Sequence, residues 1–347
     1  MGHTSGPLLF IPRCPEIIVM SVRHMLRNAL AVLAATLTGA SALAAASFPT
    51  GPVRLVVWTA PGSSIDISAR VVAEALSQQW DKPVIVENRV GASGVIATKH
   101  VADAKPDGHT LLVTTNSGHV LNPLVRADIP FDPERDFTPL GVFAEGQYAF
   151  VAAADAPYSN LNEFLEAARQ SPKGMAFGSP GQGTAMHLFG DMLGKKGGAE
   201  LIHVPYTNME VGSLTDMMDG ALGAAFWTNL SARTHSEAGR IKVLAVSGDA
   251  RSRVLPDVPT FSEQGFENYF SIVPWIGLFL PDGVPPETVE AISAGVNAAL
   301  DDPKVQRTVQ DGGFDLRKDS PAAFQQRLQE ERKKWREIIQ ETGFSPT

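Results

Sequence analysis

The chain has 347 residues, of which 44% are hydrophobic, so it can bury a large core and is long enough for two lobes. It carries 29 Lys and Arg against 37 Asp and Glu, for a formal net charge of −8, and has no basic patch that suggests nucleic acid as a partner. We therefore expect a globular protein that binds no nucleic acid.

The first 46 residues have the pattern of a leader and signal peptide. Arg23 and Arg27 precede a weakly apolar run at 29–43, which suits the core of a signal peptide and is short for a membrane span. Ala42-Leu43-Ala44 or Ala44-Ala45-Ala46 then fits a cleavage signal. We predict a cleaved signal peptide and a mature protein in the periplasm, with a buried N-terminal helix as the alternative.

The single cysteine, Cys14, falls within that leader. The mature chain would therefore have no thiol for catalysis, for a disulfide or for a metal site. The eight histidines are scattered and do not have the spacing of a metal motif. We expect no metal and no cofactor.

Short apolar runs alternate with helical patterns along the rest of the chain. The apolar runs predict nine strands, at 53–58, 83–88, 110–115, 148–154, 175–179, 201–206, 224–227, 241–247 and 275–280. Helical spacing predicts helices within 67–80, 161–170, 185–193 and 211–219, and three C-terminal helices opened by Pro286, Pro303 and Pro321. This alternation is typical of parallel α/β sheets, whose ligand loops follow the carboxyl ends of the strands.

The loop 59–66 joins the first strand to the first helix. Ser63 and Asp66 match a capping box, so the loop could serve only to start the helix. Backbone N–H groups at the positive end of a helix also stabilise an anion, and both functions can hold together. The groups in question belong to Gly62, Ser63, Ser64 and Ile65.

A second loop, at 179–184, is rich in glycine and runs into an amphipathic helix. Gly181 and Gly183 permit positive φ and let the backbone approach a ligand closely. This helix start also favours an anion. The polar side chains of the loop and of the first helical turn are Ser179, Gln182, Thr184 and His187, and the last of these could equally cap or pack the helix.

Two further loops follow strands. The loop 115–122 contains Ser117 and His119 and is compatible with a plain turn as well as with ligand contacts. In the loop 226–231, Trp227 could belong to the core or form a wall for an aromatic ligand, and Trp275 carries the same ambiguity.

None of these loops matches a catalytic motif. The run at 181–186 lacks the last glycine of a dinucleotide-binding fingerprint, and the run at 190–196 lacks the spacing of a P-loop. The sequences GSPG and GASG are each one residue short of a nucleophile elbow. We expect no catalytic residue and no enzyme, with a secreted hydrolase using Ser179 and His187 as an alternative.

The order of motifs after the leader resembles the Bug family, the substrate-binding receptors of tripartite tricarboxylate transporters. The resemblance covers essentially everything after the leader. Its motifs are FPTGPVRLVVWTAPGSSIDISAR, PVIVENRVGASGVIATKHVADAKPDGHTLL, IPFDPERDFTPLGVFA, GSPGQGTAMHLFGDML, HVPYTN, LAVSGDARSRVLPDVPTFSEQGF and WIGLFLPDGVPPETV.

The resemblance implies an α/β, two-lobed periplasmic binding protein, type II-like, with the ligand cleft between the lobes. By position, 1–46 would be leader and signal peptide, 48–149 plus 273–347 lobe one, and 150–272 lobe two. It also implies a monomer that binds a small carboxylate, aliphatic or aromatic, and delivers it to integral membrane transporter subunits. A subunit presenting its ligand to a membrane sensor kinase is the alternative.

The expected ligand-binding residues join the four loops with the tyrosine of the HVPYTN motif. They are Gly62, Ser63, Ser64, Ile65, Asp66, Ser117, His119, Ser179, Gln182, Gly183, Thr184, His187, Tyr206, Trp227 and Asn229. The four loops contain no Arg or Lys. We therefore expect backbone N–H groups and hydroxyls, rather than a guanidinium, to hold the carboxylate.

Three departures from the family pattern touch the expected cleft. Ser63-Ser64 replaces a Gly-Gly, Pro180 replaces a Gly or Ala, and the stretch 226–229 is one residue longer than its usual Phe-Asp-Asn counterpart. We therefore carry over no citrate-like specificity.

Overall fold

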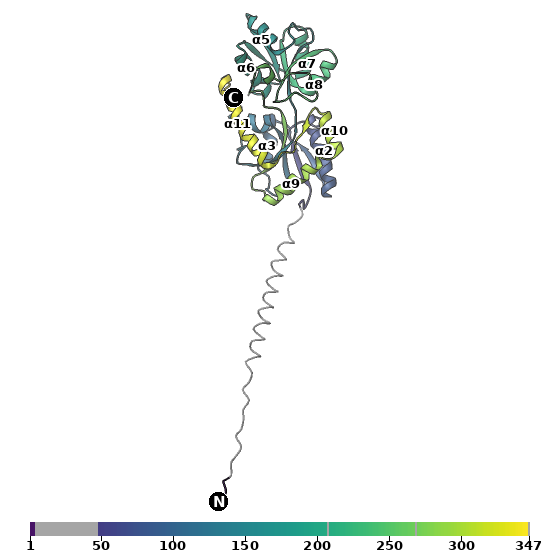
Figure 1. Cartoon of the computed structure of the whole chain (residues 1–347), viewed down its shortest axis with the longest axis vertical. Helices are drawn as coiled ribbons and strands as arrows, with labels where there is room; N and C mark the ends of the chain where they lie inside the picture. The colour runs from purple at the N-terminus through teal and green to yellow at the C-terminus, as the bar shows by residue number, and fades with distance from the viewer. Residues whose placement is uncertain (4–47, 207, 268, 346–347) are drawn as a thin grey trace. The chain divides into compact units, whose positions relative to one another are not determined.

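The structure is a computed structural model that describes residues 1–3, 48–206, 208–267 and 269–345 (Figure 1). The chain divides into two compact units, Met1–Thr50 and Gly51–Thr347, and the second contains every strand and helix described below. The predicted signal peptide, with its apolar run and its cleavage region, lies outside the described residues.

Six strands form the first sheet, in the order β11-β4-β10-β3-β1-β2. β1 pairs in parallel with β2 and β3, whereas β10 pairs antiparallel with β3 and β4. Every residue of β3 and of β10 is buried, so the middle of this sheet is core. The bounds are β1 Val53–Val57, β2 Val84–Asn88, β3 Thr110–Thr115, β4 Phe137–Glu145, β10 Trp275–Pro281 and β11 Asp315–Leu316.

Five strands form the second sheet, in the order β7-β6-β8-β5-β9. β6 pairs in parallel with β7 and β8, and β5 pairs antiparallel with β8 and β9. Every residue of β5 is buried. The bounds are β5 Tyr148–Ala153, β6 Met175–Ser179, β7 Leu201–Pro205, β8 Ala224–Thr228 and β9 Ile241–Val246.

Helices surround both sheets. In Figure 1, α5 to α8 gather around the second sheet, and α2, α3, α9 and α10 around the first. The helices are α2 Ser64–Trp80, α3 Val95–Ala102, α4 Asn122–Val125, α5 Leu161–Gln170, α6 Ala185–Gly197, α7 Met209–Met218, α8 Asn229–Glu237, α9 Pro286–Ala299, α10 Pro303–Asp311 and α11 Pro321–Thr342. Shorter helical turns are η1 Ala92–Gly94, η2 Ser117–Leu121 and η3 Ser262–Gln264.

The structure confirms the nine predicted strands and the predicted helices, but the expectation of parallel sheets is only partly right. β5 and β10 run antiparallel to their neighbours. The chain leaves the first sheet after β4, builds the whole second sheet, and returns as β10 beside β4. Neither strand therefore enters its sheet through a helical crossover connection, which is the connection that joins two parallel neighbouring strands.

Side-chain caps determine where α2 and α6 begin. The Ser63 Oγ accepts a hydrogen bond from the Asp66 N–H at 3.2 Å, and the Thr184 Oγ1 accepts one from the His187 N–H at 3.3 Å. Such caps satisfy N–H groups that have no partner within the helix. Both predicted loops therefore end at helix N-termini.

The 22-residue helix α11 packs on the first sheet and on α6. Near its start, Phe324 lies edge-on to Trp275 of β10, with ring centroids 5.2 Å apart. Near its end, Trp335 stacks on Phe189 of α6 at 5.4 Å. One helix therefore ties the first sheet to the helix that follows β6.

His119 lies in the core of the first sheet. Its ring is fully buried and stacks on Phe279, with centroids 3.9 Å apart, and its Nε2 lies 3.2 Å from the Pro133 carbonyl oxygen. Burial, reinforced by the positive charge of Arg332, lowers the pKa of His119 to about 3. The imidazole is therefore neutral at neutral pH.

A methyl group at position 190 should be poorly tolerated. The Cβ of an alanine at Gly190 would lie 1.9 Å from the Phe177 ring, which is buried in the core. We predict that Gly190→Ala lowers the free energy of unfolding by about 1–3 kcal/mol in urea titrations. Gly51→Ala is the control, because no atom lies within 4 Å of its Cβ position. Equal stabilities of the two variants would contradict the packing described.

His119 should make the folded state sensitive to acid. An unfolded histidine titrates near pH 6.5, so between this pH and about 3 the unfolded chain binds a proton that the folded His119 does not. Stability should therefore fall as the pH drops below about 6.5. We predict a shallower fall for His119→Leu in urea titrations between pH 7.5 and 4.5. Identical pH dependence in the variant and the parent would exclude this contribution.

Candidate functional site

The loop between β6 and α6 turns on two glycines. Gly181 and Gly183 have φ angles of 151° and 74°, in the region that residues with a Cβ rarely adopt. The Thr184 hydroxyl donates to the Gly181 carbonyl at 2.7 Å, and the Gly183 N–H donates to Nδ1 of His187 at 3.0 Å. These internal hydrogen bonds hold the loop in one conformation.

A chain of polar side chains lies behind this loop. The Oγ of Ser179 lies 2.6 Å from Nε2 of His203 on β7. The ring of His203 lies 3.8 Å from that of His187, centroid to centroid, and Nε2 of His187 lies 3.2 Å from Oδ2 of Asp191. The β6–α6 loop is thus joined by side chains to β7 and to the first turns of α6.

Burial keeps the two histidines neutral at neutral pH and makes Asp191 a weaker acid than usual. It lowers the pKa of His187 to about 4, with the neighbouring His203 adding to the shift, and lowers the pKa of His203 to about 4. Burial also raises the pKa of Asp191 to about 6. Because Nδ1 of His187 accepts the Gly183 N–H, the neutral ring carries its proton on Nε2, facing Asp191.

This arrangement does not support the hydrolase alternative. The imidazole within hydrogen-bond distance of the Ser179 hydroxyl is that of His203, not that of His187. Ser179 has no exposed surface, and its Oγ also accepts the Gly181 N–H at 3.2 Å. A nucleophile must reach its substrate. We therefore assign Ser179 a structural role, in which it joins β6 to β7.

Asp66 organises the other predicted loop, at 59–66. Its carboxylate accepts hydrogen bonds from the Gly62 N–H at 2.8 Å, from Arg70 Nε at 2.9 Å and from Asn88 Nδ2 at 2.7 Å. Burial raises the pKa of Asp66, but these donors outweigh it and the net pKa is lowered. The carboxylate is 1% exposed, so it serves the loop itself.

Four of the expected residues meet in a cavity of about 230 Å³. Ser117 comes from the start of η2, and Gln182, Gly183 and Thr184 come from the β6–α6 loop. A concave site with a few convergent polar groups is where small ligands usually bind. We therefore take this cavity as the candidate ligand site. Its other lining residues are Trp58, Ser93, Asn122, Val125, Arg126 and Phe344.

The remaining expected residues lie outside this lining. The cavity lining does not include the loop residues Gly62, Ser63, Ser64, Ile65 and Asp66. Ser179 and His187 lie behind the β6–α6 loop, and His119 lies in the core of the first sheet.

Three further expected residues are engaged within the second sheet and its helices. Trp227 is 1% exposed, and its Nε1 donates to the Ser213 Oγ at 2.9 Å. Tyr206 donates its hydroxyl proton to Asp216. The Asn229 Nδ2 donates to the Ser252 Oγ at 3.3 Å. The ambiguity over Trp227 and Trp275 is resolved, since both are core residues.

Arg126 is a charged residue of the cavity that the sequence reasoning missed. It follows α4, the short helix that Pro123 opens directly after the loop 115–122, and its guanidinium lies 3.2 Å from Asp128. The four loops lack Arg and Lys, yet this next helical turn brings a guanidinium to the cavity. The helix-start signal of Pro123 could have indicated it.

Trp58 and Phe344 were also missed as site residues. Trp58 was assigned to the first strand, but β1 ends at Val57 and the indole belongs to the loop that follows. Phe344 follows the C-terminal helix, and no local pattern in the sequence links it to the β6–α6 loop.

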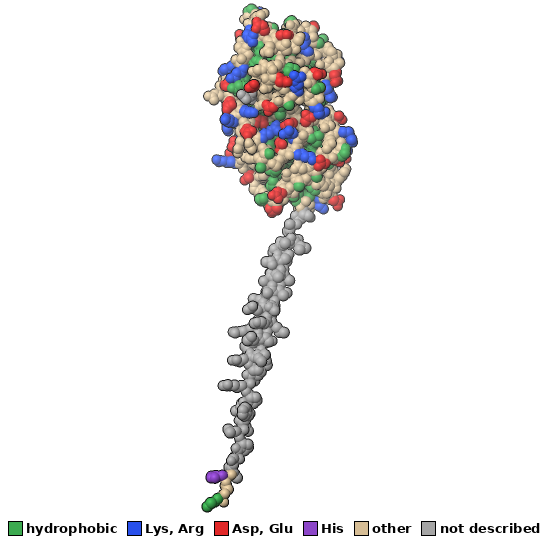
Figure 2. Space-filling view, in the orientation of Figure 1, with side chains coloured by type: hydrophobic (Ala, Val, Ile, Leu, Met, Phe, Trp, Pro, Cys, Tyr) green, Lys and Arg blue, Asp and Glu red, His purple; other side chains and the backbone are tan. Residues whose placement is uncertain are grey.

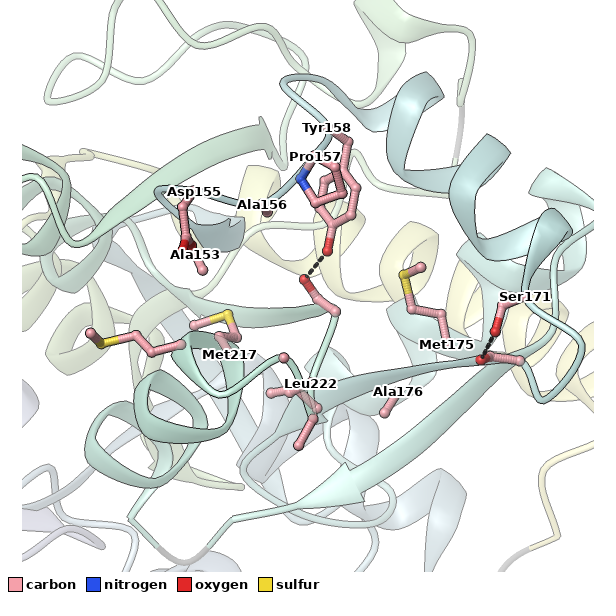
Figure 3. A pocket seen from close by; sticks show the side chains of 15 residues that line it. Ala153, Asp155, Ala156, Pro157, Tyr158, Ser171, Met175, Ala176, Met217 and Leu222 are labelled. Carbon is pink, nitrogen blue, oxygen red and sulfur yellow. Dashed lines mark hydrogen bonds between the residues drawn. The ribbon is translucent and has the colours of Figure 1, made fainter.

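A larger cavity, of about 450 Å³, lies elsewhere in the second sheet's part of the chain (Figure 3). Its lining includes Met175 and Gly223, so it lies at the starts of β6 and β8, whereas the predicted loops follow their ends. The Tyr158 and Ser171 hydroxyls that Figure 3 shows there are bonded to the backbone carbonyls of Gly223 and Gly174. The smaller cavity therefore remains the candidate.

Metal sites, membrane-spanning helices and nucleic-acid-binding surfaces are the other features to consider in the described part of the chain. No group of three or more His, Cys, Asp or Glu in the described part of the chain is placed to hold a metal ion. Among the same residues, no helix has both the length and the apolar character needed to cross a bilayer. Figure 2 shows acidic and basic side chains interspersed on one face, unlike the basic stripe of nucleic-acid-binding proteins.

The sequence is similar to that of a known receptor family and to curated relatives. Residues 68–344 match the family described as tripartite tricarboxylate transporter family receptor. A protein of Pseudomonas sp. (strain P51), encoded in the tcbD-tcbE intergenic region, is 30% identical over 329 residues, which cover 95% of this chain and 97% of that protein.

Solved structures show the same fold. A Rhodopseudomonas palustris protein with adipate has a TM-score of 0.74 and 28% identity, covering 87% of this chain and 100% of its own. MatC from Rhodopseudomonas palustris, with bound malate, has a TM-score of 0.70 and 27% identity, covering 84% of this chain and 100% of its own. The predicted α/β periplasmic-binding-protein fold is confirmed, and the chain belongs to the tripartite tricarboxylate transporter receptor family.

Proposed function

We propose that the protein captures a small carboxylate in the periplasm and delivers it to a tripartite tricarboxylate-type membrane transporter. The observation that carries this proposal is the meeting of Arg126 with the N-terminus of α6 in one cavity of about 230 Å³. A guanidinium and the positive end of a helix both favour an anion. Relatives solved with malate and adipate make a carboxylate the natural choice of anion.

The proposed mode of binding differs from the one expected from the loops alone. The Gly183 N–H already donates to His187, so it is not free for a ligand in this conformation. We propose instead that Arg126 carries most of the charge, assisted by the Ser117 hydroxyl and by the α6 terminus. Contacts from the loop 62–66 remain a proposal for a ligand that extends beyond this cavity.

The Arg126 assignment predicts a large loss of affinity on substitution. A hydrogen bond to a charged group is worth about 1.5–3 kcal/mol, so Arg126→Gln should weaken binding of the best ligand among adipate, malate and benzoate by about tenfold or more. Isothermal titration calorimetry measures this, and the corresponding amide should bind the parent protein comparably poorly. Arg135→Gln is the matched control, because Arg135 also faces an aspartate, Asp132, at 3.6 Å but does not line the cavity.

Two results would overturn the proposal. Full affinity in Arg126→Gln would remove Arg126 from the site. An amide that binds as well as its acid would mean that the cavity holds a neutral solute.

The proposal includes delivery of the ligand to transporter subunits rather than to a membrane sensor kinase. It also includes a receptor that is a monomer. A strain lacking this chain should lose uptake of the radiolabelled ligand and regain it on complementation. Unimpaired uptake, together with a lost transcriptional response to the ligand, would favour the sensor alternative.

Export by a cleaved signal peptide completes the proposal. Small residues follow the apolar run at 29–43, so cleavage should fall within 44–47. N-terminal sequencing of the protein from a periplasmic fraction should therefore begin within or just after this stretch. A periplasmic protein that retains residues 29–43 would contradict the prediction.

A further inference from the structure

The C-terminal segment forms a wall of the candidate cavity. α11 ends at Thr342, and Gly343 adopts a left-handed conformation with φ 73° that turns the chain away from the helix axis. Phe344 then lies against the β6–α6 loop: its ring is edge-on to His187, with centroids 5.7 Å apart. The Phe344 Cζ also lies 3.4 Å from where a Cβ on Gly183 would be.

Glu341 fixes this segment to α6 and to Tyr269. Its carboxylate accepts a hydrogen bond from the Tyr269 hydroxyl at 2.6 Å and pairs with Lys196 of α6 at 2.5 Å. Its backbone carbonyl accepts a hydrogen bond from Lys195. Because contacts with three side chains hold Glu341, Phe344 is presented to the cavity by a fixed helix end.

Trp58 supplies a second aromatic ring to the same cavity. The indole packs on the backbone of η1, where a Cβ on Gly94 would lie 3.4 Å from the ring atoms Cδ2 and Cγ. Its Nε1 is buried and has no hydrogen-bond partner in the structure. This nitrogen has almost no accessible surface, so the indole ring, rather than its N–H, is what a ligand in the cavity can contact.

The rest of the lining limits the ligand's size and charge. A volume of about 230 Å³ lies below the range of about 300–1,000 Å³ typical of pockets for drug-sized molecules, so one small ring suits it. Val125 adds apolar surface. Among the lining residues Arg126 is the one that carries a positive charge. The Nε and Nη2 groups of Arg126 donate to Asp128, which leaves Nη1 to donate to one ligand carboxylate.

We infer that the cavity selects an aromatic monocarboxylate, with the ring contacting Trp58 and Phe344 and the carboxylate on Arg126. This inference rests on the proposed function, since it presupposes that the cavity is the carboxylate site. It narrows the ligand class beyond the aliphatic dicarboxylates found with the two solved relatives.

The test compares benzoate with cyclohexanecarboxylate and adipate by isothermal titration calorimetry of the mature full chain. Benzoate and cyclohexanecarboxylate have similar size and the same charge, so the comparison isolates the flat aromatic face. Two aromatic contacts should favour benzoate by about tenfold over cyclohexanecarboxylate. Benzoate should also bind more tightly than adipate, because the second carboxylate of adipate would find no cation in the lining.

Substitutions assign the preference to the two rings. Trp58→Leu and Phe344→Leu should each reduce the ratio of benzoate to cyclohexanecarboxylate affinity, while Phe266→Leu, a half-buried phenylalanine outside this lining, should not. Trp58→Phe keeps an aromatic ring at this position, so it should preserve much of the preference for benzoate. Thermal unfolding of each variant checks that it is folded.

The outcomes separate the two proposals. If none of the three carboxylates binds, the proposed function is overturned and the inference fails with it. If carboxylates bind in an Arg126-dependent manner but benzoate is not preferred, or the preference survives both leucine substitutions, the aromatic inference is wrong and the proposed function stands.

Discussion

The hydrogen bond from the Gly183 N–H to Nδ1 of His187 fixes the turn on which the candidate site depends. The acceptor must be an unprotonated nitrogen, and burial lowers the pKa of His187 to about 4, so the bond persists at neutral pH. The donor must be on a glycine, because φ there is 74°. With this turn in place, residues 182–184 line the cavity and α6 begins directly behind them.

The same glycine explains how the two ends of the site meet. Phe344 comes to 3.4 Å from the position of a Cβ on Gly183, so the C-terminal segment can approach the loop as closely as it does because the side chain is absent. α11 makes this approach possible, since it packs on β10 through Phe324 and on α6 through Trp335. The cavity is therefore built from segments far apart in the sequence, joined by one long helix.

Local chemistry made most of the framework predictable from the sequence, although β4 and β11 were not predicted. The buried strands are short apolar runs, and the helices α2 and α6 begin where Ser63 and Thr184 cap them, so patterns spanning a few residues were enough. The direction of each strand was harder to predict, because a short apolar run has the same residue pattern whether the strand is parallel or antiparallel to its neighbours. The antiparallel entry of β5 and β10 depends on the path of the chain between the sheets, which no local window contains.

The site was less predictable for a related reason. Polar residues in the loops after strands correctly indicated Ser117 and the 182–184 turn as parts of the cavity lining. The same pattern does not distinguish them from His119 and Trp227, which are buried in the core. It also cannot find Phe344, whose place depends on the packing of α11. Arg126 lies just beyond the loop 115–122, directly after a short helix that Pro123 opens.

The most direct measurement is a crystal structure of the mature chain with a bound carboxylate. The account predicts that the carboxylate lies within hydrogen-bond distance of the Arg126 guanidinium, beside residues 182–184 and Phe344, with the Gly183–His187 hydrogen bond intact. A ligand bound in the larger cavity beside Tyr158 and Met175, or one held away from Arg126, would contradict it.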